Sequence, residues 1–310
     1  MKILVTGGAG FIGSNLVDKL ITLGHKVIVV DNLSTGFYKN LNPQAVFYLA
    51  DIRHQEIIEK IFRLEEPEVV DHHAAQIDVR KSVETPAFDA ECNILASINL
   101  IKTSLEHKVR KFIYISTGGA VYGEPLSLPV KEDHPINPES QYGISKHTVE
   151  HYLYLYRLHY GLNFTVLRYP NVYGPRQNPL GEAGVNAIFI HQMLNGITPT
   201  IFGDGEQLRD YVYVDDIVEA NIAALDKGGG EIFNLGCGAG ASVNDIYNEL
   251  KNILNFPHPP HYAPPRTGEI YKVYLNSAKA KQILDWQCQV SFREGLRRTV
   301  EWHKREKQKG

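Results

Sequence analysis

Cysteine, net charge and long apolar runs are all scarce in this sequence of 310 residues. The three cysteines, Cys92, Cys237 and Cys288, are scattered without a Cys-x-x-Cys pair, so the sequence indicates neither a disulfide framework nor a zinc site. A net charge of −3 provides no broad basic field for nucleic acid or an anionic membrane. No apolar run approaches the ~18 residues of a membrane span, and Met1 leads directly into a predicted strand without a signal peptide. We therefore expect a cytoplasmic protein with neither nucleic acid nor membrane as a partner.

Strand-like and helix-like stretches alternate over the first 170 residues. Such alternation predicts parallel strands joined by crossover helices, an α/β fold with a doubly wound, Rossmann-like sheet. The apolar content of 43% is sufficient for one large core or two intimate domains. The predicted strands are 2–6, 27–31, 46–50, 68–72, 111–116 and 164–169.

The second half of the chain has a different texture, with loops rich in glycine and proline around shorter elements. It predicts a smaller substrate-binding lobe over 171–310, after a dinucleotide-binding domain over 1–170. Residues 231–235 resemble one more strand that can return to the large sheet. The two domains can therefore interleave.

A glycine-rich turn separates the first predicted strand from the first predicted helix. Gly7, Gly10 and Gly13 would let the backbone turn tightly, approach a pyrophosphate and pack the helix closely. The second strand ends in Asp31, at about the ~20-residue distance where a carboxylate accepts a hydrogen bond from an adenosine ribose. Because its charge would repel a 2′-phosphate, the cofactor is predicted to be NAD and not NADP. The alternative is a purely structural turn.

Tyr142 and Lys146 lie four residues apart at the head of a predicted helix and therefore share a face. A free phenol has a pKa of ~10, and a nearby ammonium is expected to lower it. That would suit Tyr142 to move a proton on a sugar hydroxyl while NAD takes the hydride. The strand that ends in Ser116 and Thr117 would supply hydroxyls nearby. The alternative is that this common spacing lies on the surface.

These and several further stretches resemble the extended short-chain dehydrogenase/reductase family, and within it the UDP-glucose 4-epimerases, over essentially the whole chain. The stretches are 6–13, 31–36, 51–52, 73–76, 142–146, 168–175 and 209–216. The resemblance implies an NAD enzyme that interconverts UDP-glucose and UDP-galactose, with the N-acetylhexosamine pair as a further candidate. The NAD contacts that it implies are Gly7, Gly10, Phe11, Ile12, Gly13, Asp31, Asn32, Ser34, Thr35, Gly36, Asp51, Ile52, His73, Ala74, Ala75, Gln76, Asn93, Tyr142, Lys146 and Tyr169.

The resemblance also implies a UDP-sugar site. Arg209 and Arg266 would bind diphosphate oxygens, for which the planar guanidinium is well suited, although each could instead form a surface ion pair. Val273 falls where related epimerases carry a bulky tyrosine, so more room is expected beside the hexose. The implied substrate contacts are Thr117, Gly118, Gly119, Tyr142, Asn171, Val185, Ile201, Phe202, Arg209, Arg266, Glu269 and Val273.

The segment 116–123 departs from the pattern of related enzymes. It has no acid after the hydroxyl residues, which argues against a dehydratase or decarboxylase and favours a 4-epimerase. The usual catalytic Ser or Thr position falls on Gly118, so the hydroxyl would come from Thr117, Ser116 or an ordered water. We predict Thr117, because a turn that starts at Gly118 can direct it to the cleft. Another NAD-dependent nucleotide-sugar epimerase or dehydrogenase, or a non-catalytic NAD-binding regulator, remains an alternative.

The helix after Tyr142 is apolar over more of its circumference than one buried stripe requires. A symmetric homodimer is expected, because large exposed apolar patches are rare on monomers. Burial by the smaller lobe is the alternative. His258 and His261 lack a third ligand nearby in the sequence, so no metal site is predicted. The apolar positions are Val149, Tyr152, Leu153, Tyr154, Leu155, Tyr156, Leu158 and Tyr160.

Overall fold

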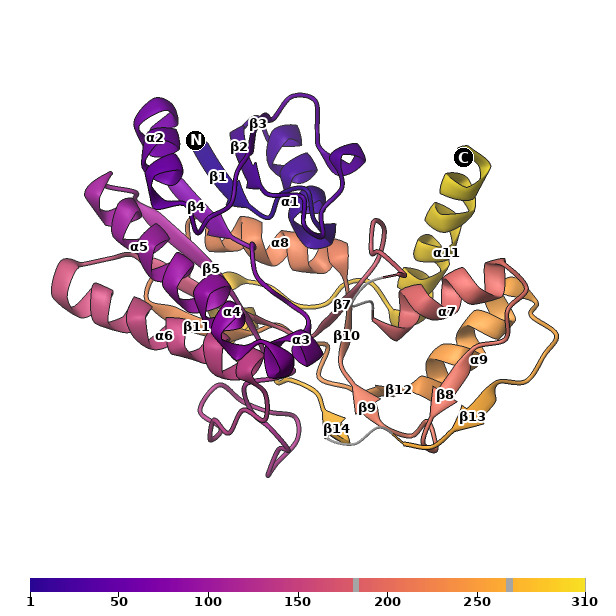
Figure 1. Cartoon of the computed structure of the whole chain (residues 1–310). Coiled ribbons are helices and arrows are strands. Elements are labelled where there is room, and N and C mark those ends of the chain that lie inside the picture. Colours follow the sequence, from indigo (N-terminus) through magenta and orange to yellow (C-terminus); the bar gives the residue numbers. More distant parts are fainter. Residues whose placement is uncertain (181–183, 266–269, 310) are drawn as a thin grey trace.

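A seven-stranded parallel sheet is the central feature of the computed structural model, which describes residues 1–180, 184–265 and 270–309 (Figure 1). The strands are ordered β3-β2-β1-β4-β5-β6-β11, and every neighbouring pair is parallel. This order confirms the predicted doubly wound fold. The strands are β1 (Lys2–Thr6), β2 (Lys26–Asp31), β3 (Val46–Leu49), β4 (Val69–His72), β5 (Lys111–Thr117), β6 (Phe164–Tyr169) and β11 (Glu231–Asn234).

Helices cover both faces of this sheet (Figure 1). One face packs against α1 (Phe11–Thr22) and α8 (Val214–Ala224). The other packs against α2 (Gln55–Glu65), α5 (Ala96–Glu106) and α6 (Gln141–Tyr160). Apolar strands of this kind are expected where a sheet is buried on both sides.

Side-chain alternation along β1 divides the core into two layers. Ile3 and Val5 belong to the layer beneath α1, whereas Leu4 belongs to the layer beneath α5. All three side chains are at most 1% exposed. The period of two in a strand therefore stabilises both faces with one short run of apolar residues.

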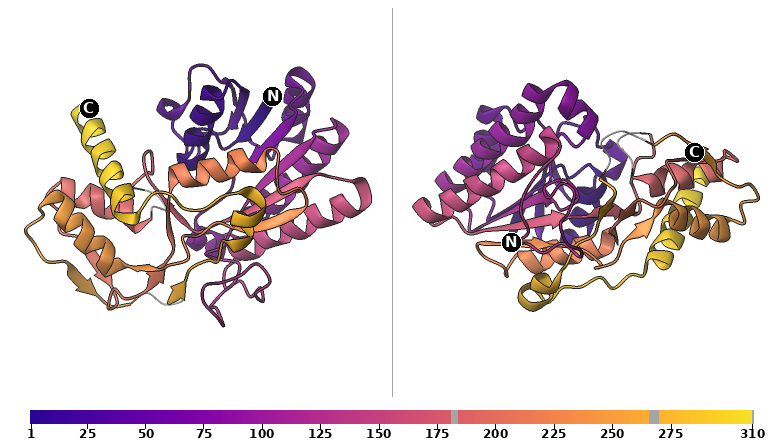
Figure 2. Two further views of the ribbon diagram at one scale, coloured as in Figure 1. Left: turned by 180° about the vertical axis from the view of Figure 1, so that it is seen from behind. Right: turned by 90° about the horizontal axis from the view of Figure 1, so that it is seen from below.

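The described part of the smaller lobe consists of short strands packed against α7 (Val185–Leu194), α9 (Val243–Leu254) and α11 (Phe292–Lys309) (Figures 1 and 2). Its strand pairs bring together segments far apart in the sequence. The strands are β7 (Asn171–Tyr173) beside β10 (Tyr211–Tyr213), β8 (Thr200–Phe202) beside β13 (His261–Ala263), and β9 (Leu208–Arg209) between β12 (Ala241–Ser242) and β14 (Lys272–Val273).

The second half of the chain returns to the large sheet. Strand β11 pairs with β6, and α10 (Ala278–Leu284) packs on β11 and α8. The return of 231–235 to the sheet is thus confirmed, while the division at residue 170 stays a prediction. Four short elements complete the list: η1 (Tyr38–Asn40), α3 (Val79–Glu84), α4 (Pro86–Ala90) and the π-helical turn η2 (Glu91–Leu95).

The cysteine prediction requires a correction. Cys237 and Cys288 form a disulfide across 51 positions, with their Cα atoms 5.5 Å apart. Cys237 follows β11, and Cys288 follows α10, which packs on that strand. The pairing therefore depends on tertiary proximity and has no signature in local spacing. Cys92 is a free, half-buried thiol.

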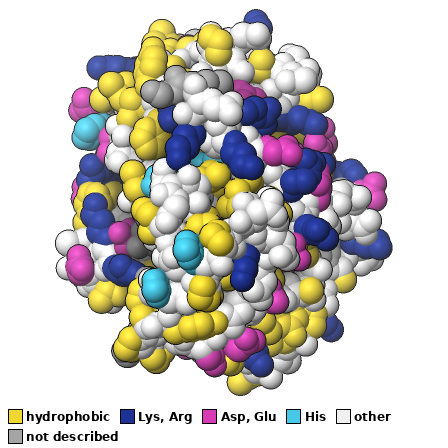
Figure 3. All heavy atoms as spheres, turned by 90° about the vertical axis from the view of Figure 1, so that its right-hand side faces the viewer, with side chains coloured by type: hydrophobic (Ala, Val, Ile, Leu, Met, Phe, Trp, Pro, Cys, Tyr) yellow, Lys and Arg dark blue, Asp and Glu magenta, His cyan; other side chains and the backbone are white. Residues whose placement is uncertain are grey.

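The surface shows no segregation of charge on the face that carries α7, α9 and α11. Basic, acidic and hydrophobic side chains are mixed there (Figure 3). Among the helices of the described chain, none combines the length and the apolar character that a bilayer span requires.

Candidate active site

The glycine-rich turn joins β1 to α1 at the carboxyl edge of the sheet. Gly7 has a φ of 71°, and a Cβ there would lie 2.8 Å from the Ala74 nitrogen. A Cβ on Gly13 would overlap the Gly7 carbonyl oxygen. Gly10 caps α1 without a side-chain hydrogen bond. The turn thus has the close packing and bare helix N-terminus that an anionic phosphate requires.

Asp31 ends β2 directly beside this turn. Its carboxylate accepts hydrogen bonds from the backbone N–H of Ala9 at 2.9 Å and of Leu33 at 2.8 Å. Burial raises the pKa of Asp31, while these two hydrogen bonds act against that shift. Gly36 lies close as well, because a Cβ there would stand 2.9 Å from the Ala9 carbonyl carbon.

The other predicted NAD contacts come from the same edge of the sheet. Asn32 donates to Asp51 at 2.8 Å, and the Ala74 N–H donates to the Thr6 hydroxyl at 3.1 Å. Gln76 and Asn93 are joined by two hydrogen bonds between backbone and side chain. The remaining predicted contacts here are Phe11 and Ile12 at the start of α1, exposed Ser34 and Thr35 after β2, buried Ile52 after β3, partly buried His73 and Ala75 after β4, and buried Tyr169 at the end of β6.

Tyr142 and Lys146 lie in the first turns of α6, whose N-cap Ser140 accepts the Gly143 N–H at 3.1 Å. The Tyr142 N–H donates to Ser82 at 3.2 Å, and the Lys146 Nζ lies 4.5 Å from the centroid of the Tyr114 ring. Lys146 is 3% exposed and faces the interior side of the helix, and the backbone of Tyr142 lies against α3, which carries Ser82.

The electrostatics of this pair differ from the sequence expectation. Burial lowers the pKa of Lys146 to about 7, although the negative charges of Glu150 and Asp89 act against this. Burial also raises the pKa of Tyr142 above that of a free phenol, and Asp89 adds to the increase. The expected lowering of the Tyr142 pKa is therefore wrong, because burial of the phenol and the negative charge of Asp89 both raise it.

The hydroxyls of Ser116 and Thr117 have different environments. The Ser116 hydroxyl is buried and donates to Glu150 at 2.6 Å. The Thr117 Oγ1 and the Asn171 Oδ1 both lie 3.8 Å from the position where a Cβ of Gly119 would stand. Thr117 and Asn171 therefore border one space above Gly119, whereas Ser116 belongs to the interior.

Packing explains why residue 118 is a glycine. A Cβ at this position would overlap the Leu275 Cδ1 and lie 3.0 Å from its Cδ2. Leu275 is 1% exposed, and its N–H donates to Asp210 at 3.0 Å. The place of the usual hydroxyl residue is thus closed by a leucine that the surrounding structure holds.

Two predicted substrate residues, Arg209 and Val273, are neighbours in the smaller lobe. The parallel register of β9 and β14 places Arg209 opposite Val273. The Arg209 guanidinium donates to the Leu208 carbonyl at 2.9 Å. Val273 is 3% exposed and packs with Val121 in the core, so its side chain does not border open space.

Other predicted substrate residues are more dispersed. Val185 begins α7, and Ile201 is buried beside partly buried Phe202 in β8. Arg266 and Glu269 lie outside the described residues. Among the described residues, no three side chains of His, Cys, Asp or Glu form a group that could hold a metal ion.

Comparison with known proteins accounts for this geometry. A model of the NAD dependent epimerase/dehydratase family matches residues 3–236. The chain belongs to this family. Membership confirms the predicted family resemblance, the enzyme class and the NAD cofactor.

Three solved structures are similar over almost the whole length. UDP-glucose 4-epimerase of Thermotoga maritima with UDP-glucose is 52% identical, with a TM-score of 0.97 and 99% of both chains covered. The Thermus thermophilus UDP-glucose 4-epimerase complex with NAD is 41% identical, with a TM-score of 0.93 and coverage of 98% and 99%. UDP-N-acetylglucosamine 4-epimerase of Methanobrevibacter ruminantium is 34% identical, with a TM-score of 0.93 and 98% of both chains covered.

The structure contains a buried polar network beneath α6 that the sequence did not predict. Glu150 accepts hydrogen bonds from the Arg168 Nε at 2.9 Å and from its Nη2 at 2.5 Å. Arg168 also donates to the Tyr122 hydroxyl at 2.7 Å, which donates to Asn234 at 2.8 Å. Glu150 is four residues after Lys146, and this spacing is the only sequence signal that could have linked it to the pair.

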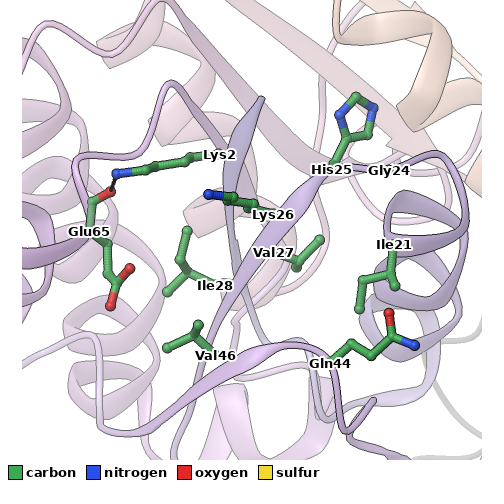
Figure 4. A pocket seen from close by; sticks show the side chains of 10 residues that line it. All are labelled: Lys2, Ile21, Gly24, His25, Lys26, Val27, Ile28, Gln44, Val46 and Glu65. Atoms are coloured by element: carbon green, nitrogen blue, oxygen red, sulfur yellow. Dashed lines mark hydrogen bonds between the residues drawn. The ribbon is translucent and has the colours of Figure 1, made fainter.

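A cavity of about 450 Å³ lies elsewhere (Figure 4). Lys2 and Lys26, at the first positions of β1 and β2, line it together with Glu65 and Gln44. The Lys2 Nζ donates to the Glu65 carbonyl at 2.8 Å. Because these are the amino ends of the strands, this cavity is at the opposite edge of the sheet from the glycine-rich turn and belongs to a different part of the molecule.

Proposed function

We propose that this chain is an NAD-dependent 4-epimerase that interconverts UDP-glucose and UDP-galactose. The observation that carries the proposal is the pairing of Tyr142 and Lys146 on α6, at the same edge of the sheet as the glycine-rich turn. The resemblance to the Thermotoga maritima enzyme with UDP-glucose supports the choice of substrate.

NAD, when bound, would accept a hydride from carbon 4 of the sugar and return it to the opposite face. The turn around Gly10 and the carboxylate of Asp31 would hold the dinucleotide. Tyr142 would take the proton of the 4-hydroxyl and later give it back. Its neutral phenol is favoured by burial, so a cationic Lys146 is needed to favour the phenolate. Thr117 would relay the proton between the sugar and Tyr142.

The UDP portion would lie in the smaller lobe. Arg209 would bind diphosphate oxygens, and Asn171, which borders the same space as Thr117, would contact the substrate beside it. A product that keeps its oxidation state requires no net consumption of NAD, which separates an epimerase from a dehydrogenase.

The decisive experiment is incubation of the purified holoenzyme with UDP-galactose without added oxidant or reductant, followed by chromatographic identification of the product. We expect UDP-glucose. In Tyr142→Phe, turnover should fall by about 10²–10⁴-fold with NAD retained, because one positioned proton-transfer group is lost. Tyr160→Phe, at the 69% exposed end of the same helix, is the matched control. An oxidised product with stoichiometric NADH would instead identify a dehydrogenase, and no reaction would favour the regulator.

The N-acetylhexosamine pair is a second proposed substrate. Valine at position 273 is smaller than tyrosine, and a UDP-N-acetylglucosamine 4-epimerase is among the similar structures. Val273 is buried, and its side chain packs into the core. Any additional room for the sugar would therefore arise because valine extends less far than tyrosine would at this position. Rates with UDP-N-acetylglucosamine and UDP-galactose should lie within about tenfold of each other. Complete rejection of the acetylated sugar would contradict this.

We also propose that the protein is a homodimer that associates through the outer face of α6. Tyr154, Leu155, Leu158 and Tyr160 are 45–69% exposed on this helix, whereas Val149 and Leu153 are buried. The exposed residues lie away from the sheet, so the alternative of burial by the smaller lobe is wrong for these positions. Covering such an apolar face with a second copy would remove it from water.

A further inference from the structure

Asp89 is a fully buried carboxylate on the short helix α4, with 0% of its surface exposed. Its Oδ2 accepts the Ser145 hydroxyl at 2.6 Å. Its Oδ1 accepts the side-chain amides of Asn93 at 2.9 Å and Gln76 at 3.1 Å. These three donors are neutral, and none of the ion pairs found within the described residues involves Asp89. A buried charge in this position is costly unless nearby groups gain from it.

The partners of Asp89 connect the catalytic helix with the segment predicted to hold NAD. Ser145 directly precedes Lys146 on α6. Gln76 and Asn93 bind each other, since the Gln76 N–H donates to the Asn93 Oδ1 at 2.8 Å and the Asn93 amide donates to the Gln76 carbonyl at 2.9 Å. One carboxylate therefore holds α6 against the chain that follows β4.

A comparison with Glu150 shows why Asp89 matters electrostatically. Glu150 is also buried near Lys146, but it is paired with Arg168 through two hydrogen bonds. Glu150 nevertheless contributes the larger upward effect on the Lys146 pKa, and Asp89 contributes the next. Within the described residues no ion pair includes Asp89, so its carboxylate is a second negative charge that acts on Lys146.

We propose that Asp89 is a positioning residue of the reaction centre, which holds α6 against the predicted cofactor segment and keeps the Lys146 side chain cationic. The inference rests on the proposed function, because only a reaction that uses Tyr142 and Lys146 makes this arrangement matter for turnover.

The pKa shifts agree with the geometry. Burial lowers the pKa of Lys146 to about 7, and Glu150 and Asp89 act in the opposite direction. Asp89 also contributes to the raised pKa of Tyr142. Loss of this negative charge should therefore lower the pKa of both groups. The charged and titratable groups around Lys146 are Tyr142 and Glu150 on α6, Asp89 on α4, Tyr114 on β5 and His72 on β4. The charges of Glu91 and Cys92 on the neighbouring η2 instead contribute to the raised pKa of Arg53.

The test is Asp89→Asn, which keeps the shape and removes the charge. In this variant the pH profile of kcat/KM for UDP-galactose should move to lower pH by about one unit, since both limbs follow groups that face Asp89. At pH 8 kcat should fall roughly tenfold. Independently of activity, the Nζ resonance of Lys146 in the ¹⁵N-lysine holoprotein, assigned by its loss in Lys146→Arg, should titrate at lower pH than in the wild type.

Two further variants separate charge from structure. Ser145→Ala removes one hydrogen bond but keeps the Asp89 charge, so kcat should fall several-fold with the pH profile in place. Asp216→Asn is the matched control, because Asp216 is another buried carboxylate that accepts backbone N–H groups, from Val290 at 3.0 Å and Gln289 at 3.2 Å. It should lower the melting temperature and leave the profile unchanged.

An Asp89→Asn enzyme with a lower melting temperature and an unmoved profile and Lys146 titration would overturn the proposal, because the residue would then be structural only. If Asp89→Asn does not fold, Ser145→Ala decides, and wild-type kcat in that variant overturns the positioning role. Absence of epimerisation in the wild type would overturn the proposed function instead, while the Lys146 titration still tests the charge.

Discussion

At the scale of single residues, the hydroxyl available to the candidate site is the one that has no hydrogen-bond partner among the described residues of the protein interior. Ser116 and Thr117 are adjacent at the end of β5, yet Ser116 donates to Glu150 in the interior and Thr117 borders the space shared with Asn171. Strand alternation directs neighbouring side chains to opposite faces, and here it separates a hydroxyl engaged in the interior from one that borders the space beside Asn171.

Replacement of Thr117 by Val, which nearly preserves shape, should reduce kcat by one or more orders of magnitude with a small loss of stability, because the proposed proton relay would be lost. Ser116→Ala should show the reverse pattern, a loss of about 1–3 kcal/mol of stability with most turnover retained, since a buried carboxylate loses a donor. Steady-state kinetics and denaturant unfolding measure both. Wild-type kcat in Thr117→Val, with a crystallographic water beside Tyr142, would transfer the role to solvent.

Gly118→Ser should restore the hydroxyl position of related enzymes and still destabilise this protein by about 1–3 kcal/mol, because the new Cβ overlaps buried Leu275. Leu275→Ala alone should cost about 2–5 kcal/mol, as expected for a cavity in a core. The double variant should be more stable than the sum of the two losses predicts, which a double-mutant cycle by urea unfolding measures. Strict additivity would mean that the two positions do not compete for space.

At the scale of elements, α6 has two separate tasks on its two faces. The inner face carries Lys146 and Glu150 together with apolar Val149 and Leu153, and it packs on β5 and α5. The outer face is aromatic and aliphatic but exposed. The apolar residues of α6 thus cover more of the helix than its contact with the core requires. The additional residues form a second, exposed apolar surface.

Leu158→Glu, at a position 64% exposed, should dissociate the proposed homodimer into monomers, because a charge would be buried without a partner. Analytical ultracentrifugation measures the association. Leu64→Glu, at a position 71% exposed on α2, is the control and should leave association unchanged. A wild-type protein that is monomeric at micromolar concentration would contradict the proposal directly.

At the scale of the whole molecule, the smaller lobe is joined to the large sheet by one continuous core. Residues of α7, α9 and α11 belong to the same apolar cluster as residues of β1 and α1. Titration of a group in this shared core should therefore affect the stability of the entire chain.

His303 lies on α11, which contributes Leu296 and Val300 to this core. Burial, with a contribution from His191, lowers its pKa from 6.5 to about 4. The unfolded chain binds this proton below about pH 6.5 and the folded protein only below about 4, so stability should fall as the pH drops through this range, by about 3 kcal/mol in all. His303→Phe should flatten the decline in urea unfolding between these pH values, whereas His258→Phe in an exposed loop should not. An unchanged decline in His303→Phe would assign the acid sensitivity to other groups.

The sequence by itself determined the large sheet, the glycine-rich turn with Asp31, and the Tyr142–Lys146 face of α6. These features are local: a strand has a period of two, a helix repeats after three or four residues, and a turn needs glycine at particular positions. The predicted strands accordingly begin and end within one residue of those in the structure.

Only the tertiary structure decided which distant side chains meet. The disulfide, the packing of Leu275 against Gly118 and the hydrogen bond between Asp89 and Ser145 join residues between 51 and 157 positions apart. The raised pKa of Tyr142 belongs to the same class, because desolvation depends on everything packed around the phenol. Contacts of this kind produce no periodic pattern in the sequence. They depend on how the strands and helices are arranged in space.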